Sequence, residues 1–299
     1  MDFSIIIPHR NSVRYLPKLF SSIPNSDRIE IIIVDNSFEP VTKDDIGINR
    51  DYILLHSAPE RGAGGARNVG IEHANGKWLL FLDADDYFAE GAFDVFFSKV
   101  NTDSDIVYTC MGGVYLDTGK PSDRGSGYTR MVQQYLAGNI PETDLRFCFS
   151  SPCCKMVRHD MVKKYKLRYD EVTASNDMYF SMLSGYYAKK IEAVNFKTYI
   201  ATVSKGTLTK RRDYPVISAR YYVNLRYNKF LKDHGYSQYQ RSILNYGLTL
   251  CKMGLRPAFE AFKLLFVYRQ NPFVGYRNWI SSYIAKCNKD LRDRKYITK

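Results

Sequence analysis

The sequence has few of the features that mark secreted, membrane-spanning or zinc-binding proteins. Its six cysteines include no Cys-x-x-Cys pair, so we expect reduced thiols rather than a zinc site or a disulfide framework. No uninterrupted apolar run approaches the ~20 residues that span a bilayer. Residues 1–4 lead into an apolar segment without a basic leader, so we expect no signal peptide. These absences predict a cytoplasmic protein.

Charge is unevenly distributed along the 299 residues. Residues 205–299 contain 20 Lys and Arg against 5 Asp and Glu, a net charge of +15, whereas residues 1–204 contain 23 against 26, a net charge of −3. The length allows one large domain with an appendage. We therefore predict a domain over residues 1–210 and a basic, aromatic-rich helical extension over residues 211–299.

The most informative stretch is an apolar run, residues 78–82, that ends in Asp83, Ala84, Asp85 and Asp86. The run predicts a strand that is buried on both faces, and ligands of open α/β sheets bind beyond the carboxyl ends of the strands. Two carboxylates about 4 Å apart repel by roughly 4 kcal/mol at an effective dielectric near 20, which favours a bound cation. Carboxylates with open positions suit Mg²⁺ or Mn²⁺. The alternative is a solvated acidic turn that ends the strand.

The first hundred residues alternate between strand and helix patterns. Strands are predicted at residues 4–8, 29–34, 52–56 and 78–82. Helical patterns follow at residues 16–23 and 92–100, and the glycine-rich segment at residues 61–70 enters a helix that Asn75-Gly76 ends. This alternation predicts an α/β fold with a mostly parallel sheet flanked by helices. Beyond it we expect short strands at residues 106–109 and 113–116. Residues 117–127 then form a polar loop, which either shapes an acceptor pocket or is only a surface connection.

The glycine-rich segment at residues 61–70 is not a dinucleotide fingerprint. Arg67 stands where the third glycine should be, and the segment does not follow the first strand. It leads into a helix whose N-terminus can attract a phosphate, with help from Arg67. The other interpretation is a helix start with small residues that allow close packing on the sheet, and both can hold together.

A second polar stretch, residues 174–180, opens a helix that runs to about residue 188. Ser175 or Asn176 can cap this helix, and Asp177 falls in its first turn. An acid at this position either takes part in chemistry or only compensates the helix dipole. Lys155, which lies upstream, is expected to be solvated.

Together these segments resemble glycosyltransferase family 2, whose members use nucleotide sugars and have the GT-A fold. The resemblance covers residues 1–210. It includes Ile33-Val34-Asp35-Asn36-Ser37, the Asp-x-Asp signature at Asp83-Ala84-Asp85, and an Asn176-Asp177 pair similar to the family's Glu-Asp motif. The resemblance implies that Asp177 is the catalytic base and that Asp85 ligates Mn²⁺ or Mg²⁺. The residues that it implies for nucleotide-sugar binding are Pro8, Arg10, Asp35, Gly64, Arg67, Asp83 and Ala84.

The resemblance implies inverting transfer of one sugar to a hydroxyl of a glycan or lipid-linked acceptor in surface polysaccharide synthesis. The Gln-x-x-Arg-Trp signature of processive relatives is absent. From the family resemblance we also expect a uridine nucleotide in the donor. Two alternatives stay open. One is a sugar nucleotidyltransferase, and the other is a non-catalytic glycan- or membrane-binding relative, suggested by the substituted Asn36 and Asn176.

The tail beyond Asp213 has helical patterns. Residues 258–268 are almost uniformly apolar, and Phe273, Tyr276, Ile280, Ile284 and Cys287 fall near one helical face. Such faces favour packing of the helices on one another and on the catalytic domain. The excess positive charge suits peripheral contact with an anionic cytoplasmic membrane leaflet, and the alternative is a homo-oligomer interface that binds an acidic glycan. Nucleic acid is not indicated, because no binding motif accompanies the charge.

Overall fold

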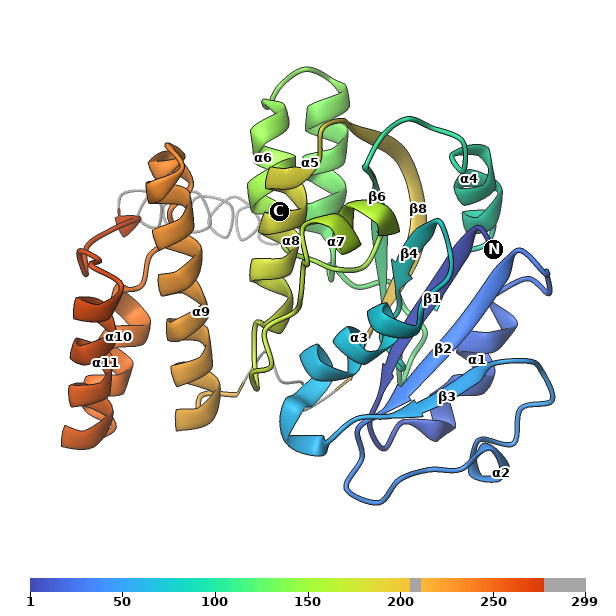
Figure 1. The fold of residues 1–299 in the computed structure, drawn as a ribbon, viewed down its shortest axis with the longest axis horizontal. Helices are drawn as coiled ribbons and strands as arrows, with labels where there is room; N and C mark the ends of the chain where they lie inside the picture. Colours follow the sequence, from blue (N-terminus) through green and yellow to red (C-terminus); the bar gives the residue numbers. More distant parts are fainter. Residues whose placement is uncertain (205–210, 277–299) are drawn as a thin grey trace, which may run out of the picture. The chain divides into compact units, whose positions relative to one another are not determined.

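The computed structural model describes residues 1–204 and 211–276, and the chain divides into two compact units, Met1–Lys210 and Arg211–Lys299 (Figure 1). Within the described residues, the first unit contains an eight-stranded sheet of order β3-β2-β1-β4-β7-β6-β8-β5. The strands are β1 (Phe3–His9), β2 (Ile29–Asp35), β3 (Ile53–His56), β4 (Trp78–Phe81), β5 (Tyr87–Phe88), β6 (Ile106–Tyr115), β7 (Lys155–Arg158) and β8 (Ile191–Val203). The helices are α1 (Leu16–Ser21), α2 (Lys43–Ile46), α3 (Gly62–His73), α4 (Ala92–Ser98), α5 (Ser126–Leu136), α6 (Glu142–Cys148), α7 (His159–Lys164) and α8 (Asn176–Tyr187).

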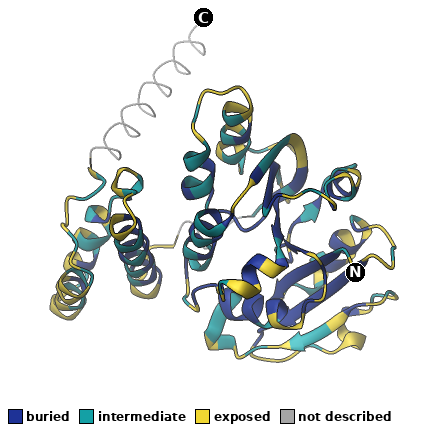
Figure 2. Cartoon of the chain, turned by 45° about the horizontal axis from the view of Figure 1, so that its top comes forward, coloured by how far each residue is buried: buried dark blue, intermediate teal, exposed yellow. Residues whose placement is uncertain are grey.

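The parallel part of the sheet brings the ends of three predicted strands to one edge. β1 pairs in parallel with β2 and β4, with His9 opposite Asp35 and Ile6 opposite Phe81. These three strands are buried along their whole length, as their apolar runs predict (Figure 2). β7 is antiparallel to both β4 and β6, and β5 is antiparallel to β8. The prediction of a mostly parallel α/β sheet flanked by helices is confirmed.

The middle of the first unit differs from the sequence-based expectation. The two strands expected at residues 106–109 and 113–116 form one strand, β6, which pairs in parallel with β8 with register shifts near Cys110. Gly112 allows this pairing, because a Cβ atom there would lie 2.8 Å from the Ile200 side chain. β8 was not expected, since its middle residues are polar or half exposed and only the pairing with β6 makes the segment a strand.

The second unit contains helices, as expected for the tail. Its described helices of more than one turn are α9 (Tyr214–Asp233), α10 (Leu244–Lys252) and α11 (Leu255–Val267). Asp213 caps α9 by accepting a hydrogen bond from the backbone of Val216. A small core joins the three helices, with Tyr221, Leu250 and Ala261 at its centre. In the ranges 1–204 and 211–276 every helix is too short or too polar to cross a bilayer. Most of the apolar face predicted over residues 273–287 lies outside the described residues.

Close packing explains Gly64, one of the residues predicted to bind the donor. Gly64 lies inside α3, which packs against β1 and β2. A Cβ atom on Gly64 would lie 2.0 Å from the backbone oxygen of Asp170, so the chain segment before α8 can approach α3 only because residue 64 has no side chain. Close packing therefore accounts for this glycine, but its neighbour is the segment before α8 and not the sheet, and its contact with the donor stays a prediction.

Gly64→Ala should destabilise the first unit by about 1 to 3 kcal/mol, because backbone atoms rather than a flexible side chain must move to admit the methyl group. The measurement is the free energy of unfolding in urea. Gly127→Ala is the matched control, since Gly127 lies exposed in α5 and a Cβ atom there would have no neighbouring atom within 4 Å. That change should leave the stability equal or raise it by up to about 1 kcal/mol. Equal effects of the two substitutions would contradict the packing argument.

Candidate active site

The acids after β4 lie in a tight turn. The backbone N–H of Asp86 donates to the carbonyl oxygen of Asp83 at 2.9 Å. Because the chain turns here, the side chains of Asp83, Asp85 and Asp86 enter three different environments: half-buried, exposed and buried. The turn therefore places three neighbouring carboxylates in three different environments.

Asp86 holds the turn against β8. The hydroxyl of Tyr199 donates to Asp86 Oδ2 at 2.6 Å, and the backbone N–H of Thr202 donates to Asp86 Oδ1 at 2.6 Å. Thr202 also donates through its hydroxyl to the carbonyl of Asp85 at 2.9 Å. Burial, together with the charges of Asp85 and Asp83, raises the pKa of Asp86 well above its ordinary value. With both carboxylate oxygens engaged, Asp86 is a structural residue.

Arg67 connects the acidic turn to the start of α8. Its guanidinium donates to Asp83 Oδ1 at 2.5 Å and to Asn176 Oδ1 at 2.8 Å, and it lies over the ring of Tyr169. Burial by itself would lower the pKa of Arg67, but the Asp83 carboxylate raises it above its ordinary value, so the group stays charged. Arg67 lies in the second turn of α3 and is buried. It bridges two site segments instead of standing free at a helix N-terminus.

This bridge also corrects the predicted helix cap. The side chain of Asn176 accepts from Arg67, and Ser175 has a left-handed backbone (φ 60°) with no cap hydrogen bond from its side chain. Neither residue caps α8 in the manner expected from the sequence. The reason is tertiary, because a buried guanidinium is a stronger donor to the Asn176 amide oxygen than a helix N–H.

Asp83 and Asp177 share the wall of a cavity of about 620 Å³. Its other lining residues are Asp86, Met111, Tyr115, Ser122, Asp123, Arg124, Gly125, Tyr128, Ser151, Pro152, Cys153, Tyr199, Ala201 and Val203. Asp177 projects from the first turn of α8 and is half-buried. Burial raises its pKa, against the opposing charges of Arg67 and Lys155. A carboxylate with a raised pKa beside a cavity of this size fits a general base that acts on a bound substrate.

Asp85 is the carboxylate of the turn that is free to bind a ligand. The residue is exposed and no other described residue donates a hydrogen bond to its carboxylate, while partial desolvation of the carboxyl and the nearby Asp83 charge raise its pKa. A divalent cation would relieve this repulsion, and an exposed carboxylate with open positions beside it is the donor set that Mg²⁺ and Mn²⁺ accept. No three acidic, histidine or cysteine side chains of the described chain converge on a metal position, so a cation at Asp85 would need ligands from the substrate.

Asp35 organises the turn after β2. Its carboxylate is buried, pairs with His9 Nδ1 at 2.9 Å, and accepts from the Ser37 hydroxyl at 2.7 Å and the Val41 N–H at 3.1 Å. Burial opposes the ionised form, but these hydrogen bonds hold the pKa of Asp35 below its ordinary value. The carboxylate is therefore ionised and already engaged, and a direct contact with a nucleotide base stays a prediction.

The remaining predicted residues do not line the cavity. Pro8 is buried in β1, and Ala84 is buried in the turn. Arg10 is exposed, with its guanidinium over the Phe38 ring at 4.9 Å. The structure thus brings Asp83 and Asp177 together, places Arg67 behind them and leaves the others at the edge of the sheet.

The loop before α5 contributes to the cavity wall. Arg124 of this loop lines the cavity, and its charge acts to lower the pKa of Asp85. Ser122, Asp123 and Gly125 line the same wall. Of the two alternatives weighed for residues 117–127, the structure supports the one in which the loop forms part of a pocket.

Lys155 is buried instead of solvated, which corrects the expectation. It is 1% exposed, and its Nζ donates to the Ser181 hydroxyl at 3.0 Å. Ser181 in turn donates to the carbonyl of Ser150 at 2.9 Å, so this chain of bonds links β7, α8 and the segment that lines the cavity. Burial lowers the pKa of Lys155 to about 8. The structure gives it no carboxylate within ion-pair distance among the described residues.

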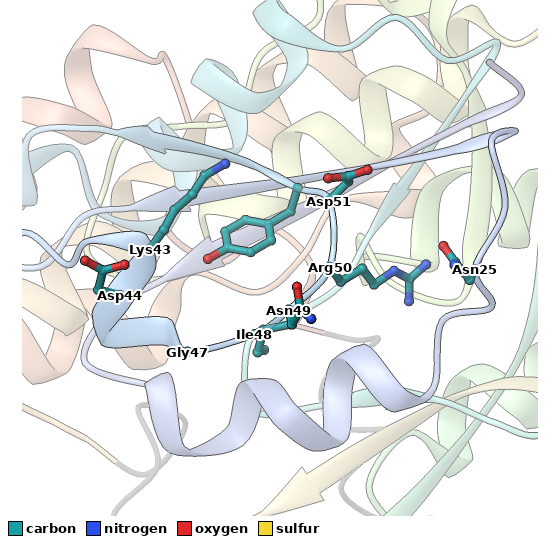
Figure 3. A pocket seen from close by; sticks show the side chains of 9 residues that line it. Asn25, Lys43, Asp44, Gly47, Ile48, Asn49, Arg50 and Asp51 are labelled. Atoms are coloured by element: carbon teal, nitrogen blue, oxygen red, sulfur yellow. The ribbon is translucent and has the colours of Figure 1, made fainter.

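A larger cavity of about 780 Å³ lies elsewhere, around the chain between β2 and β3 (Figure 3). Its principal cation, Arg50, already donates to the carbonyls of Phe20 and Ile23, and Lys43 lies over the Tyr52 ring at 5.0 Å. None of the residues predicted for chemistry lines it. The smaller cavity at Asp83 and Asp177 is therefore the candidate active site.

Sequence reasoning gave no role near the site to His9 or Tyr199, and it expected Lys155 to be solvated. His9 orients Asp35, and the Tyr199 hydroxyl accepts from the backbone N–H of Asp83 at 3.2 Å while it donates to Asp86. Tyr199 lies in β8, the strand that the sequence did not predict. No local pattern marks these residues, because each acts through a partner at least 26 positions away along the chain.

A mostly parallel sheet with an acidic turn beyond its carboxyl edge, next to a cavity with a candidate base, indicates a sugar transferase of the GT-A type. The family model described as "Glycosyl transferase family 2" matches residues 4–166, which is more than half of the chain. The chain belongs to glycosyltransferase family 2, and the resemblance noted from the sequence is confirmed.

Related proteins include two poly(ribitol-phosphate) sugar transferases. The chain is 25% identical over 217 residues to the poly(ribitol-phosphate) beta-N-acetylglucosaminyltransferase TarS of Staphylococcus aureus (strain MW2), an alignment of 69% of this chain and 36% of TarS. It is 26% identical over 203 residues to a poly(ribitol-phosphate) beta-glucosyltransferase of Bacillus spizizenii, with 64% of this chain and 30% of that protein aligned. The chain thus spans about a third of the length of these relatives.

Solved structures share the fold. The crystal structure of S. aureus TarS 1–349 in complex with UDP-GlcNAc has a TM-score of 0.65 and 20% identity, and the match covers 90% of this chain and 80% of that one. The mannosyltransferase PcManGT from Pyrobaculum calidifontis, in complex with GDP-Man and Mn²⁺, has a TM-score of 0.58 and 14% identity, with 97% and 87% covered. At these identities the likeness shows the GT-A-like fold.

Lys155→Met should raise the free energy of unfolding at pH 7, because the variant no longer buries a charge. Lysine has a pKa of 10.5 in the unfolded chain and about 8 in the folded protein. Below about pH 8 the full burial cost is present, and it is relieved as the pH rises from about 8 to 10.5. The advantage of Lys155→Met over the wild type should therefore shrink by roughly 3 kcal/mol across this window.

Urea unfolding of both proteins at several pH values between 7 and 10.5 measures this difference. Lys163→Met is the matched control, because Lys163 lies exposed on α7 and its ammonium stays in water. A Lys155→Met advantage that stays constant with pH would show that Lys155 is not buried as a charged group.

Proposed function

We propose that this chain transfers one sugar, with inversion, from a nucleotide-diphosphate sugar to a hydroxyl of a glycan or lipid-linked acceptor. The observation that carries the proposal is the cavity of about 620 Å³ that exposes both Asp83 and Asp177. A UDP-linked donor is supported by the likeness to TarS, which was crystallised in complex with UDP-GlcNAc. A role in surface-polymer synthesis is supported by the two transferases of poly(ribitol-phosphate).

The acceptor hydroxyl is proposed to enter the cavity beside Asp177. This carboxylate takes the hydroxyl proton, and the resulting oxygen attacks the anomeric carbon from the face opposite the diphosphate, which inverts that carbon. The raised pKa of Asp177 improves its match to the hydroxyl as a base. Arg67 and Asn176 hold this end of α8 in place relative to Asp83.

The leaving diphosphate needs positive charge. Arg67 is already engaged, so the exposed Arg124 at the cavity is the better candidate for a direct contact with the phosphates. A divalent cation bound with Asp85 would supply further neutralisation. Asp83 is proposed to contact the donor, with its orientation fixed by Arg67. Contacts of Pro8, Arg10, Asp35 and Ala84 with the nucleotide are proposed from the family resemblance alone.

The rival functions have less support. A sugar nucleotidyltransferase does not fit membership of glycosyltransferase family 2. A non-catalytic relative would have no need for Asp177 beside an open cavity, and Asn176 has a structural partner in Arg67 that accounts for its presence. Contact with an anionic membrane and assembly into a homo-oligomer are further proposals about the basic second unit.

Asp177→Asn should reduce turnover by at least about a hundredfold, because the amide cannot accept the acceptor proton. Donor affinity should stay within a few-fold, since the side chain keeps its shape. The measurement is release of nucleoside diphosphate from a panel of nucleotide sugars, followed by the same assay on the variant with the best donor. Asp160→Asn, an exposed acid on α7, is the control and should retain full turnover. Full turnover by Asp177→Asn would remove this residue from the mechanism.

Asp85→Asn should abolish the part of donor binding that depends on a divalent cation. Isothermal titration calorimetry with the best donor, with and without Mn²⁺, measures this part directly. Asp94→Asn in α4 removes an exposed acid elsewhere and should bind as the wild type does. If Mn²⁺ strengthens donor binding equally in the wild type and in Asp85→Asn, the cation is not held by Asp85.

A further inference from the structure

α11 carries an apolar stripe on the side that faces away from its own unit. We call this row of side chains, which consists of Leu255 and the three aromatic residues Phe259, Phe262 and Phe266, the aromatic stripe. They recur every three or four residues and are 92, 68, 64 and 86% exposed. The opposite side of the helix is packed, since Ala261 is buried and its carbonyl accepts from the Tyr221 hydroxyl. The sequence favoured packed helices here, but no described residue of this unit covers the stripe.

The apolar surface continues from α11 onto α10. Leu248 of α10 is 53% exposed and lines a small apolar cavity of about 90 Å³ together with Phe262. The exposed positions of these helices are visible in Figure 2. A contiguous patch of large apolar side chains on two helices is unusual for a free surface and indicates a partner.

Basic side chains border the stripe. Arg256 and Lys263 each follow a stripe residue by one position, so they lie along one flank of it, and both are exposed. Glu260 is the single acid of α11, and it is half-buried. Across residues 211–276 the unit has 11 Lys and Arg against 3 Asp and Glu, a net charge of +8. The complementary partner is therefore both apolar and anionic.

We propose that the aromatic stripe binds an anionic lipid membrane, with α11 lying in the plane of the headgroups. Phenylalanine side chains would enter the boundary between headgroups and acyl chains, and Arg256 and Lys263 would meet lipid phosphates. A second copy of the chain fits less well, because it would bring the same net positive charge to the contact. Only the biological role of this membrane contact rests on the proposed function. That role is to bring the catalytic unit to a lipid-linked acceptor.

Cosedimentation of the full chain with vesicles tests the surface. The wild type should bind vesicles that contain phosphatidylglycerol, bind phosphatidylcholine vesicles weakly, and lose affinity as salt is added. Phe259→Ser with Phe266→Ser should weaken binding at least about tenfold. Leu136→Ser with Phe196→Ser, which removes two apolar side chains that are 50 and 38% exposed in the first unit, should bind as the wild type does.

The contribution of the basic side chains to vesicle binding is tested with a second pair of double variants. Arg256→Gln with Lys263→Gln should weaken binding to the anionic vesicles by roughly tenfold or more, whereas Arg212→Gln with Lys232→Gln removes the same charge away from the stripe and should have a smaller effect. Circular dichroism should show that every variant remains folded.

Three outcomes would overturn the proposal. They are a wild type that ignores anionic vesicles, a stripe variant that binds them unchanged, and a dimer in light scattering that dissociates in the stripe variant without loss of vesicle binding. Release of nucleoside diphosphate without vesicles should be the same in the wild type and the stripe variant. Loss of that activity in all proteins would count against the proposed function and not against the membrane surface.

Discussion

The site depends on the two bonds that the buried Arg67 guanidinium makes. One bond holds Asp83 in the turn after β4, and the other holds Asn176 at the start of α8, more than a hundred positions further along the chain than Arg67. A buried arginine without its carboxylate would cost about 3 to 5 kcal/mol, so the fold strongly favours the arrangement in which both segments meet. Asp177, the neighbour of Asn176, reaches the cavity as a consequence. The geometry proposed for catalysis is therefore a by-product of satisfying one buried charge.

The acidic turn shows how tertiary contacts give similar residues different tasks. Asp83 forms an ion pair with Arg67, Asp86 accepts two hydrogen bonds from β8, and Asp85 is exposed. Burial penalises an ionised carboxylate unless donors compensate for it, so the engaged acids are fixed in place and the free one is available to a ligand. The Asp-x-Asp pattern by itself does not distinguish these roles.

The two units differ in surface charge and in exposed apolar side chains as well as in fold. The first unit has a nearly balanced charge and a cavity with both acidic and apolar residues in its wall, whereas the described part of the second unit is strongly basic and exposes large apolar side chains on α11. A cavity suits a small substrate, whereas an exposed basic and apolar face suits a larger anionic partner.

The sequence by itself predicted the parallel strands, the acidic turn at their carboxyl edge and the family, because these follow from local patterns: apolar runs, glycine stops and short motifs. It did not predict β8, the buried state of Lys155 or the uncovered face of α11. β8 is polar in its middle and becomes a strand only by pairing with β6, and Lys155 is enclosed by α8 and aromatic rings from distant segments. Periodicity identifies an apolar face but not the residues that pack on it. Only the tertiary structure decided that, among the described residues, Ala261 is buried and the aromatic stripe is exposed.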